Sequence, residues 1–215
     1  MIMLEVNSVS VKIGAILALK KFTLNIKKGE MIALIGRNGA GKTTLLKSIM
    51  GVNKLSEGII KFNNINLANS ASHERAALGI GYMPEDRALI PELTVEENIV
   101  LPSWSIQNLN SDERLRLVYK IMPELKEMSD RKALLLSGGQ QKMAALGRAL
   151  VLGTQLLLLD EPFEGVAPAL SQRLGEVIRG LKKQNMSIIL SQSELNHTAD
   201  IFDKQFVIER GENVN

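Results

Sequence analysis

A glycine-rich string between an apolar segment and a helix-forming segment constrains this chain most. Residues 36–43 read GRNGAGKT and follow MIALI at residues 31–35. A continuous apolar run is typical of a parallel strand covered on both faces. The string KTTLLKSIM then predicts a helix that Gly51 ends. Because the glycines allow backbone N–H groups to curl around an anion, and the helix N-terminus adds its dipole, we expect a phosphate site on an α/β fold.

The loop and the first turn of that helix supply the candidate nucleotide-binding residues. Lys42 is expected to neutralise the β- and γ-phosphates, the Thr43 hydroxyl to ligate Mg²⁺, and Thr44 to donate to the α-phosphate. The alternative is a chance glycine-rich turn, which the flanking strand and helix disfavour. The full set of candidates in this segment is Gly36, Arg37, Asn38, Gly39, Ala40, Gly41, Lys42, Thr43 and Thr44.

The string LLLLDE at residues 156–161 supports the same site. An apolar strand that ends in Asp160 places a carboxylate at the carboxyl edge of the sheet, where ligands of open α/β folds gather. Asp160 suits the Mg²⁺ shell, through water, and Glu161 is a candidate general base for water attacking the γ-phosphate. The alternative is an acidic turn at a strand end before Pro162.

A second candidate anion-binding turn opens the string LSGGQQKMAALGRAL at residues 136–150. Its residues Ser137, Gly138, Gly139 and Gln140 precede or begin a predicted helix. One chain has no use for two such turns on one nucleotide. A second copy or a homologue, packed head to tail, would use this turn to close over the first chain's γ-phosphate.

The order of the predicted elements indicates a single domain over residues 1–215. Strand patterns alternate with helical ones, which argues for a parallel α/β core. The pattern becomes helical over residues 88–152, where Thr94 and Glu97 form a predicted capping box. We therefore expect a helical lobe inserted in a core made of residues 1–87 and 153–215, with a further helix starting at Ser193.

The charge and hydropathy of the chain bear on whether it binds nucleic acid or spans a membrane. The net charge of +3 comes from 26 basic and 23 acidic residues, a balance that gives no support for a nucleic-acid partner. The apolar runs are far shorter than the roughly 20 residues that a membrane helix needs, and the first residues do not resemble a signal peptide. We expect a soluble protein of the cytoplasm that would serve a membrane process by docking on other subunits.

With these strings in place, the sequence resembles the nucleotide-binding subunits of ABC transporters over nearly its whole length. The strings GIGYMPEDRALIPELTVEEN and DEPFEGVAPAL are most similar to one of the two ATPases of branched-chain amino-acid importers, and ATPases of urea and short-chain amide importers are close relatives. The resemblance implies a RecA-like P-loop core, a small antiparallel β lobe and a helical lobe. It also implies an ATP-sandwich dimer, with a different ATPase or a second copy, docked at the cytoplasmic face of the membrane on two transmembrane permease subunits that a solute-binding protein feeds.

The resemblance also assigns roles to residues. It implies that Lys42 and Thr43 bind phosphate and Mg²⁺, that Asp160 serves the metal and that Glu161 is the base. It implies that residues 137–140 contact the partner's nucleotide. Glu85 stands in the loop that normally carries a glutamine between the metal site and the membrane subunit, so it is a candidate for both nucleotide and metal.

Three positions depart from the family pattern. Ile13 stands where an aromatic residue usually stacks on adenine, which predicts weaker base selectivity. Ala167 replaces the aspartate that usually links the two sites of the dimer. Gln192 stands where a histidine usually touches the γ-phosphate. Its amide can donate a hydrogen bond, but it cannot carry a positive charge or accept and release a proton as a histidine does. His197 lies five residues further on and is predicted to be helix surface, so that His197→Ala should change activity by no more than about twofold.

Four classes of function are compatible with the nucleotide motifs to different degrees. The leading one is a transport ATPase that works as half of a dimer. The second is a binding module that holds ATP while its partner carries most of the turnover. An ABC ATPase of translation or DNA repair usually has two cassettes or a long insertion, and a P-loop kinase or GTPase does not need LSGGQQ.

Overall fold

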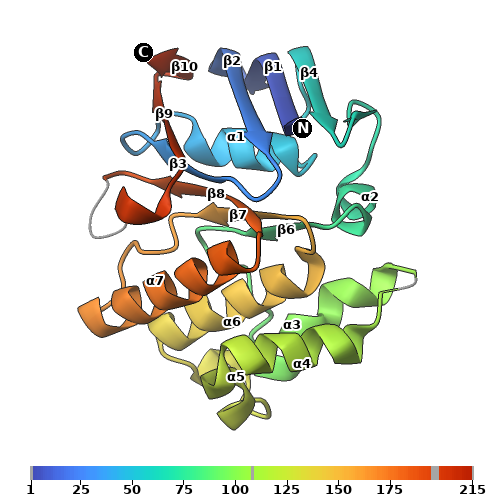
Figure 1. The fold of residues 1–215 in the computed structure, drawn as a ribbon, viewed down its shortest axis with the longest axis vertical. Coiled ribbons are helices and arrows are strands. Elements are labelled where there is room, and N and C mark those ends of the chain that lie inside the picture. Colours follow the sequence, from blue (N-terminus) through green and yellow to red (C-terminus); the bar gives the residue numbers. More distant parts are fainter. Residues whose placement is uncertain (1, 108, 195–198, 215) are drawn as a thin grey trace.

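Two sheets lie on either side of helix α1 in the computed structural model, which describes residues 2–107, 109–194 and 199–214 (Figure 1). The strands are β1 (Ile2–Ile13), β2 (Ile16–Lys27), β3 (Met31–Ile35), β4 (Glu57–Phe62), β5 (Ile65–Asn66), β6 (Ile80–Met83), β7 (Leu156–Asp160), β8 (Ser187–Gln192), β9 (Lys204–Glu209) and β10 (Glu212–Val214). The α-helices are α1 (Lys42–Ile49), α2 (Ser72–Ala77), α3 (Val95–Val100), α4 (Ser111–Ile121), α5 (Pro123–Glu127), α6 (Gly138–Leu152) and α7 (Pro168–Lys183). Short 3₁₀ helices are η1 (Leu101–Ser105), η2 (Ala133–Leu135) and η3 (Ala199–Ile201).

The order of strands in the larger sheet brings five carboxyl ends to one edge. Its order is β10-β9-β3-β8-β7-β6, in which β9 through β6 run parallel and β10 runs antiparallel to β9. In the registers of the central strands, Ile35 pairs with Gln192 and Asp160 pairs with Ser191. Residues that follow β3, β7 and β8 are therefore neighbours in space, which is where ligands of open α/β sheets bind.

The smaller sheet has the order β2-β1-β4-β5 and is antiparallel throughout. It covers α1 on the side away from the larger sheet (Figure 1). The predicted α/β class, with a parallel core and a small antiparallel sheet, is confirmed.

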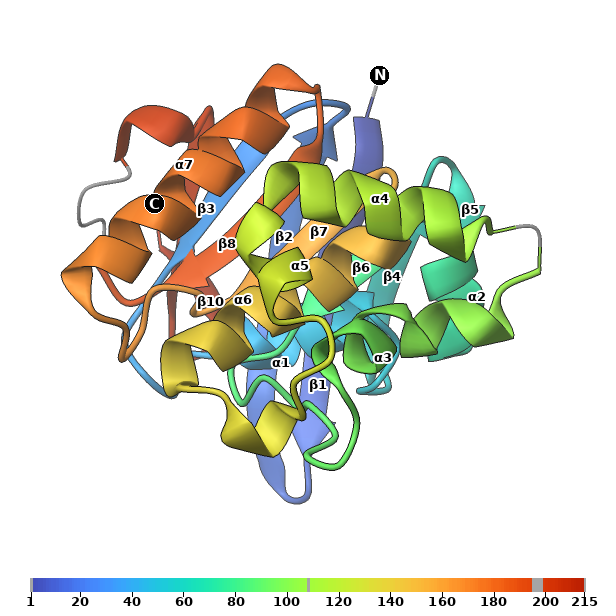
Figure 2. The same cartoon turned by 90° about the horizontal axis from the view of Figure 1, so that it is seen from below.

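Strand β7 shows why the central strands are continuously apolar. Leu156 and Leu158 belong to the core shared with α1 and the smaller sheet, whereas Leu157 and Leu159 belong to the core shared with α6 and α7. All four side chains are fully buried. Figure 2, seen from the helical side, shows α6 and α7 packed across the sheet. Helices α3, α4 and α5 lie on the side of α6 that faces away from the sheet. Since both faces are covered, alternation of apolar and polar residues is lost.

The helices α3 to α6 occupy the chain between β6 and β7. The predicted capping box is confirmed: Thr94 Oγ1 accepts from Glu97 N at 3.1 Å, and Glu97 Oε2 accepts from Thr94 N at 2.8 Å. Of the described helices, none is long and apolar enough to cross a membrane.

The helix predicted from Ser193 is not observed in the described residues. Ser193 and Glu194 form a bend, and only the short η3 follows. Strand β8 extends to Gln192, and the Ser193 hydroxyl donates to Asn38 Oδ1 at 3.0 Å, so its side chain is bonded to the phosphate loop instead of to a helix start. Residues 195–198, and with them the prediction for His197, lie outside the described part of the chain.

Candidate functional site

The loop from Gly36 to Gly41 joins the end of β3 to the start of α1. Gly39 and Gly41 have φ values of 80° and 114°, which disfavour any residue with a Cβ. No side chain caps the first turn of α1, so its N–H groups have no partner within the helix. An anion in the loop would satisfy these donors and benefit from the helix dipole.

Strands far along the chain hold this loop from behind. Gly36 N donates to the Gln192 carbonyl at 3.3 Å, and Gly211 N donates to the Ala40 carbonyl at 2.8 Å. A Cβ on Gly36 would lie 2.3 Å from the Ile208 carbonyl oxygen, which is closer than any real contact. The loop is therefore fixed by backbone packing between β8 and β9.

Lys42 forms an ion pair with Glu161 at the mouth of the loop. Its Nζ lies 2.8 Å from Glu161 Oε1 and donates to the Gly36 carbonyl at 2.5 Å, with both charged side chains nearly inaccessible. A hollow of about 300 Å³ opens beside this pair. It is lined by Ala18, Asn38, Gly39, Gly41, Lys42, Thr43, Thr44, Glu85 and Glu161. A buried ammonium and free helix N–H groups in one small hollow suit phosphate oxygens.

Asp160 is fully buried at the carboxyl end of β7 and accepts hydrogen bonds from three hydroxyls. Thr43 Oγ1 lies 3.1 Å and Ser191 Oγ 2.6 Å from Asp160 Oδ1, and the Tyr82 hydroxyl lies 3.2 Å from Oδ2. Burial raises the pKa of Asp160, while the three hydroxyls oppose the rise. Burial and the Asp160 charge together raise the pKa of Tyr82. The three hydroxyls thus stabilise the ionised form of this buried carboxylate.

The oxygens of Thr43 and Asp160 fit a magnesium site. Mg²⁺ prefers hard oxygen ligands, keeps several waters and relies on one or two carboxylates plus substrate phosphates. In the described part of the chain no group of three or more His, Cys, Asp or Glu residues could hold a metal alone. The Thr43 hydroxyl and the Asp160 carboxylate fit an ion whose other ligands are phosphate oxygens and water.

Glu161 has an unusual backbone that aims its carboxylate at the loop. Its φ is 47°, in the left-handed region, and it is 5% exposed. Glu161 N donates to Ser191, both to the carbonyl at 3.2 Å and to Oγ at 3.1 Å. The Glu161 carbonyl accepts from Lys142 Nζ at 2.9 Å, and Oε1 accepts from the Ser193 hydroxyl at 3.3 Å. A non-glycine residue in this region is typical of functional sites.

Gln192 and Glu85 flank this centre. Gln192 is the last residue of β8, is 5% exposed, and its Nε2 has no hydrogen-bond partner among the described residues. Glu85 lines the same hollow as Lys42. Partial burial, and then repulsion from Asp160, Glu164 and Glu161, raises the pKa of Glu85.

In the turn at residues 137–140, Ser137 and Gly138 are exposed and the next two residues are half-buried, and none of the four lines the hollow at Lys42. Ser137 is the N-cap of α6: its Oγ accepts from Gln140 N at 3.3 Å, and Gln140 Oε1 accepts from Ser137 N at 3.0 Å. One chain therefore does not bring its two predicted anion-binding turns together.

Two of the departing residues lie away from the hollow. Ile13 ends β1 at the tip of the β1–β2 hairpin and is 48% exposed, and it is Ala18 of β2 that lines the hollow. Ala167 is the N-cap of α7 and offers no side-chain hydrogen bond there.

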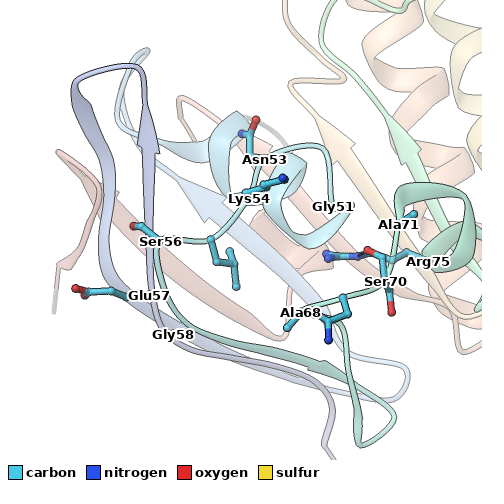
Figure 3. Close-up of a pocket in the computed structure, with 12 residues that line it drawn as sticks. Gly51, Asn53, Lys54, Ser56, Glu57, Gly58, Ala68, Ser70, Ala71 and Arg75 are labelled. Atoms are coloured by element: carbon cyan, nitrogen blue, oxygen red, sulfur yellow. Dashed lines mark hydrogen bonds between the residues drawn. The ribbon is translucent and has the colours of Figure 1, made fainter.

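A larger hollow of about 610 Å³ lies elsewhere, between the loop after α1 and the start of α2 (Figure 3). Arg75 reaches from α2 into this region and donates to the carbonyls of Ser48 and Ile49 at 2.8 Å and of Leu67 at 2.6 Å. These bonds satisfy the C-terminal carbonyls of α1, so Arg75 is already engaged in structure. The smaller hollow at Lys42 is the better site for chemistry, despite its size.

Sequence patterns missed Tyr82, Ser191 and Lys142. The first two stand near the ends of strands that neighbour β7, so the shared carboxyl edge of the sheet was the available signal. Lys142 stands three and four residues before Ala145 and Leu146, which are buried. A lysine aligned with an apolar helix stripe is a signal for a buried, bonded cation.

Comparisons with known proteins agree with this geometry. A family model described as ABC transporter matches residues 19–164. BraG of Pseudomonas aeruginosa, a high-affinity branched-chain amino acid transport ATP-binding protein, is 35% identical over 97% of this chain and 90% of its own length. LivF of Archaeoglobus fulgidus, a probable branched-chain amino acid transport ATP-binding protein, is 32% identical over 87% and 80%. XylG of Sulfolobus acidocaldarius, a xylose/arabinose import ATP-binding protein, is 30% identical over 97% and 85%.

Solved structures show the same fold. The ADP conformation of MJ1267, an ATP-binding cassette of an ABC transporter, has a TM-score of 0.84 at 29% identity and covers all of this chain and 90% of that one. The dimeric, post-hydrolysis state of the cassette MJ0796, bound to ADP and Pi, has a TM-score of 0.87 at 26% identity, with 99% and 97% covered.

Proposed function

The chain belongs to the ABC transporter family of ATP-binding cassettes, and from this premise we propose that it powers an importer of branched-chain amino acids. It is an ATPase. The observation that carries hydrolysis at this site is the placement of the Glu161 carboxylate 2.8 Å from Lys42 Nζ at the mouth of the phosphate loop.

Each part of the site receives a role in ATP hydrolysis. The loop N–H groups and Lys42 bind the phosphates, and the carboxylate of Glu161, freed from Lys42, accepts a proton from the water that attacks the γ-phosphorus. Mg²⁺, held by Thr43 and Asp160, would neutralise charge on the phosphates. The unpartnered Gln192 Nε2 donates to a γ-phosphate oxygen, and Glu85, which lines the same hollow, contacts the nucleotide or its metal.

We assign the turn at residues 137–140 to the nucleotide of a partner ATPase. Its exposure, and its absence from this chain's own hollow, support a head-to-tail dimer. ABC cassettes work as dimers with transmembrane permease subunits. For this chain we propose a second, different ATPase as the partner, with a homodimer as the alternative.

An apolar groove of about 290 Å³ is proposed to dock a helical segment of a permease at the cytoplasmic face of the membrane. Pro84 lines this groove and the next residue, Glu85, lines the nucleotide hollow, so one loop joins the two sites. The groove is lined by Met50, Tyr82, Pro84, Leu101, Pro102, Arg148, Ala149 and Leu152. In this assignment residues 88–152 form the helical lobe that carries one wall of the groove.

The cargo is proposed from the likeness to BraG and LivF. Urea or short-chain amides are the alternative cargo. Reconstitution with its permease and binding protein tests the choice: leucine, isoleucine or valine should stimulate ATP hydrolysis, and stimulation by urea or acetamide alone would contradict it.

A second candidate function is a binding module whose partner carries most of the turnover. Gln192 favours it, because an amide cannot carry the charge or proton of a histidine. Single-site hydrolysis in the assembled transporter separates the two functions. If Glu161→Gln abolishes turnover at this site, while the equivalent change in the partner leaves it, the chain hydrolyses ATP itself. If Glu161→Gln leaves turnover intact, the hydrolysis proposal fails for this site.

A further inference from the structure

Lys142 is a buried lysine that joins helix α6 to the turn that carries Glu161. It is 2% exposed, and its Nζ donates to the Glu161 carbonyl at 2.9 Å and to the Glu164 carbonyl. A buried ammonium is unfavourable unless it is bonded, and burial, followed by the charge of Arg87, lowers the pKa of Lys142. The two carbonyls and the carboxylates of Glu161 and Glu164 offset that cost, so this contact is specific.

The peptide that Lys142 holds needs support. Glu161 has a left-handed backbone, which is unfavourable for a residue with a Cβ. Ser191 holds the N–H side of Glu161, with bonds from its carbonyl and its hydroxyl, and Lys142 holds the carbonyl side. In this arrangement the carboxylate reaches Lys42. Loss of either support would allow the carboxylate to leave its position.

The other end of this link is the turn at residues 137–140. Its reciprocal hydrogen bonds between Ser137 and Gln140 make it part of α6. Lys142 stands five residues after Ser137, about 7.5 Å along the axis at 1.5 Å per residue. A shift or rotation of the turn therefore moves Lys142 with it. Ala167, at the start of α7, has no side-chain group that could provide another polar link.

We propose that Lys142 is a positioning residue that transmits the placement of the turn at residues 137–140 to Glu161. The nucleotide held by the partner at this turn would then control hydrolysis in this chain's own site. This inference rests on the proposed function, namely ATP hydrolysis in a head-to-tail dimer.

The test uses the assembled transporter, in which the partner's catalytic carboxylate is replaced by glutamine so that turnover reports on this chain. Lys142→Met keeps an unbranched stem and removes the ammonium. Because misplacement of a reacting group costs up to about 100-fold, we expect kcat to fall by about 10- to 100-fold. KM for ATP should stay within about twofold, since Lys142 does not line the hollow that would hold ATP. Lys142→Arg, which retains donors and charge, should recover most of kcat.

Lys182→Met is the matched control. Lys182 also donates to a main-chain carbonyl, that of Ile201 at 2.5 Å, but from α7 and away from the site. We expect unchanged kcat. An unchanged kcat in Lys142→Met, or a joint loss of kcat and ATP binding, would overturn the inference.

A double-mutant cycle tests the coupling itself. Ser137→Ala weakens the turn, and its effect on kcat should be smaller in the Lys142→Met background than in the parent. If the two effects multiply, the link does not exist; if Lys142→Met does not assemble, the same cycle is measured with Lys142→Gln, which removes the ammonium and keeps a polar group. Glu161→Gln in the same assembly distinguishes failure of the proposed function from failure of this inference. If Glu161→Gln keeps its turnover, the proposed function is refuted. If Glu161→Gln loses turnover while Lys142→Met has a normal kcat, only this inference is refuted.

Discussion

Replacing Gln192 by methionine should stabilise the nucleotide-free chain and weaken nucleotide binding at the same time. Gln192 is buried, and its Nε2 has no partner among the described residues. An unsatisfied buried donor costs about 1–3 kcal/mol. Methionine keeps the apolar stem, worth about 0.8 kcal/mol per buried methylene, and removes the donor.

The two effects have different magnitudes as well as opposite signs. The free energy of unfolding without nucleotide should rise by about 1 kcal/mol, which raises Tm by about 2–4 °C for a domain of this size. With MgATP, the variant loses a hydrogen bond to a charged phosphate, worth about 1.5–3 kcal/mol. The affinity for ATP should therefore fall by about 10- to 150-fold.

Thermal unfolding with and without MgATP, in a Glu161→Gln background that prevents turnover, measures both effects. Gln184→Met is the matched control, because Gln184 is exposed at the end of α7 and should show neither effect. A variant Gln192→Met that is less stable without nucleotide, and that keeps the full MgATP-dependent shift, would refute the reasoning.

Other outcomes follow from residues outside the hollow at Lys42. The chain should bind ATP and GTP with comparable affinity, measured by titration calorimetry, because Ile13 offers no aromatic ring to stack on adenine; a strong ATP preference would contradict this. Partial burial raises the pKa of Glu124, but hydrogen bonds and charge from Arg173 outweigh it and lower the pKa below 4.5. The pair's contribution, about 0.5 kcal/mol after screening of these partly exposed groups, is present above pH 4.5 and is lost as the pH falls through the lowered pKa. Urea unfolding should accordingly show Glu124→Gln destabilised at neutral pH and equal to the parent in acid. Arg75→Met should cost about 3 kcal/mol of stability by leaving carbonyls of α1 unpaired, with nucleotide affinity unchanged; an equal loss of affinity would show that Arg75 also serves the site.

The sequence predicted those parts of the fold that depend on residues close together along the chain. The apolar run before Gly36 became β3, the box at Thr94 and Glu97 became the start of α3, and Asp160 ended β7. Each depends on residues within a few positions along the chain, so periodicity and capping rules apply directly.

Contacts between distant segments were not predictable in this way. The hydroxyls of Tyr82 and Ser191 reach Asp160 because three parallel strands end at one edge, and the register of those strands is a property of the whole sheet. Ser193 likewise bonds to Asn38, 155 residues earlier, and no local pattern around Ser193 indicates this contact.

The backing of the phosphate loop by β8, β9 and Gly211 sets the order in which this chain can mature on a ribosome. The glycine-rich loop is made early, yet the carbonyls of Gln192 and Ile208 and the N–H of Gly211 that fix it come more than 150 residues later. At about 5–20 residues per second, the nascent loop waits about 8–30 seconds for its backing strands. Until then it has no fixed shape for a phosphate to bind, so ATP should neither assist folding of the nascent chain nor be hydrolysed by it.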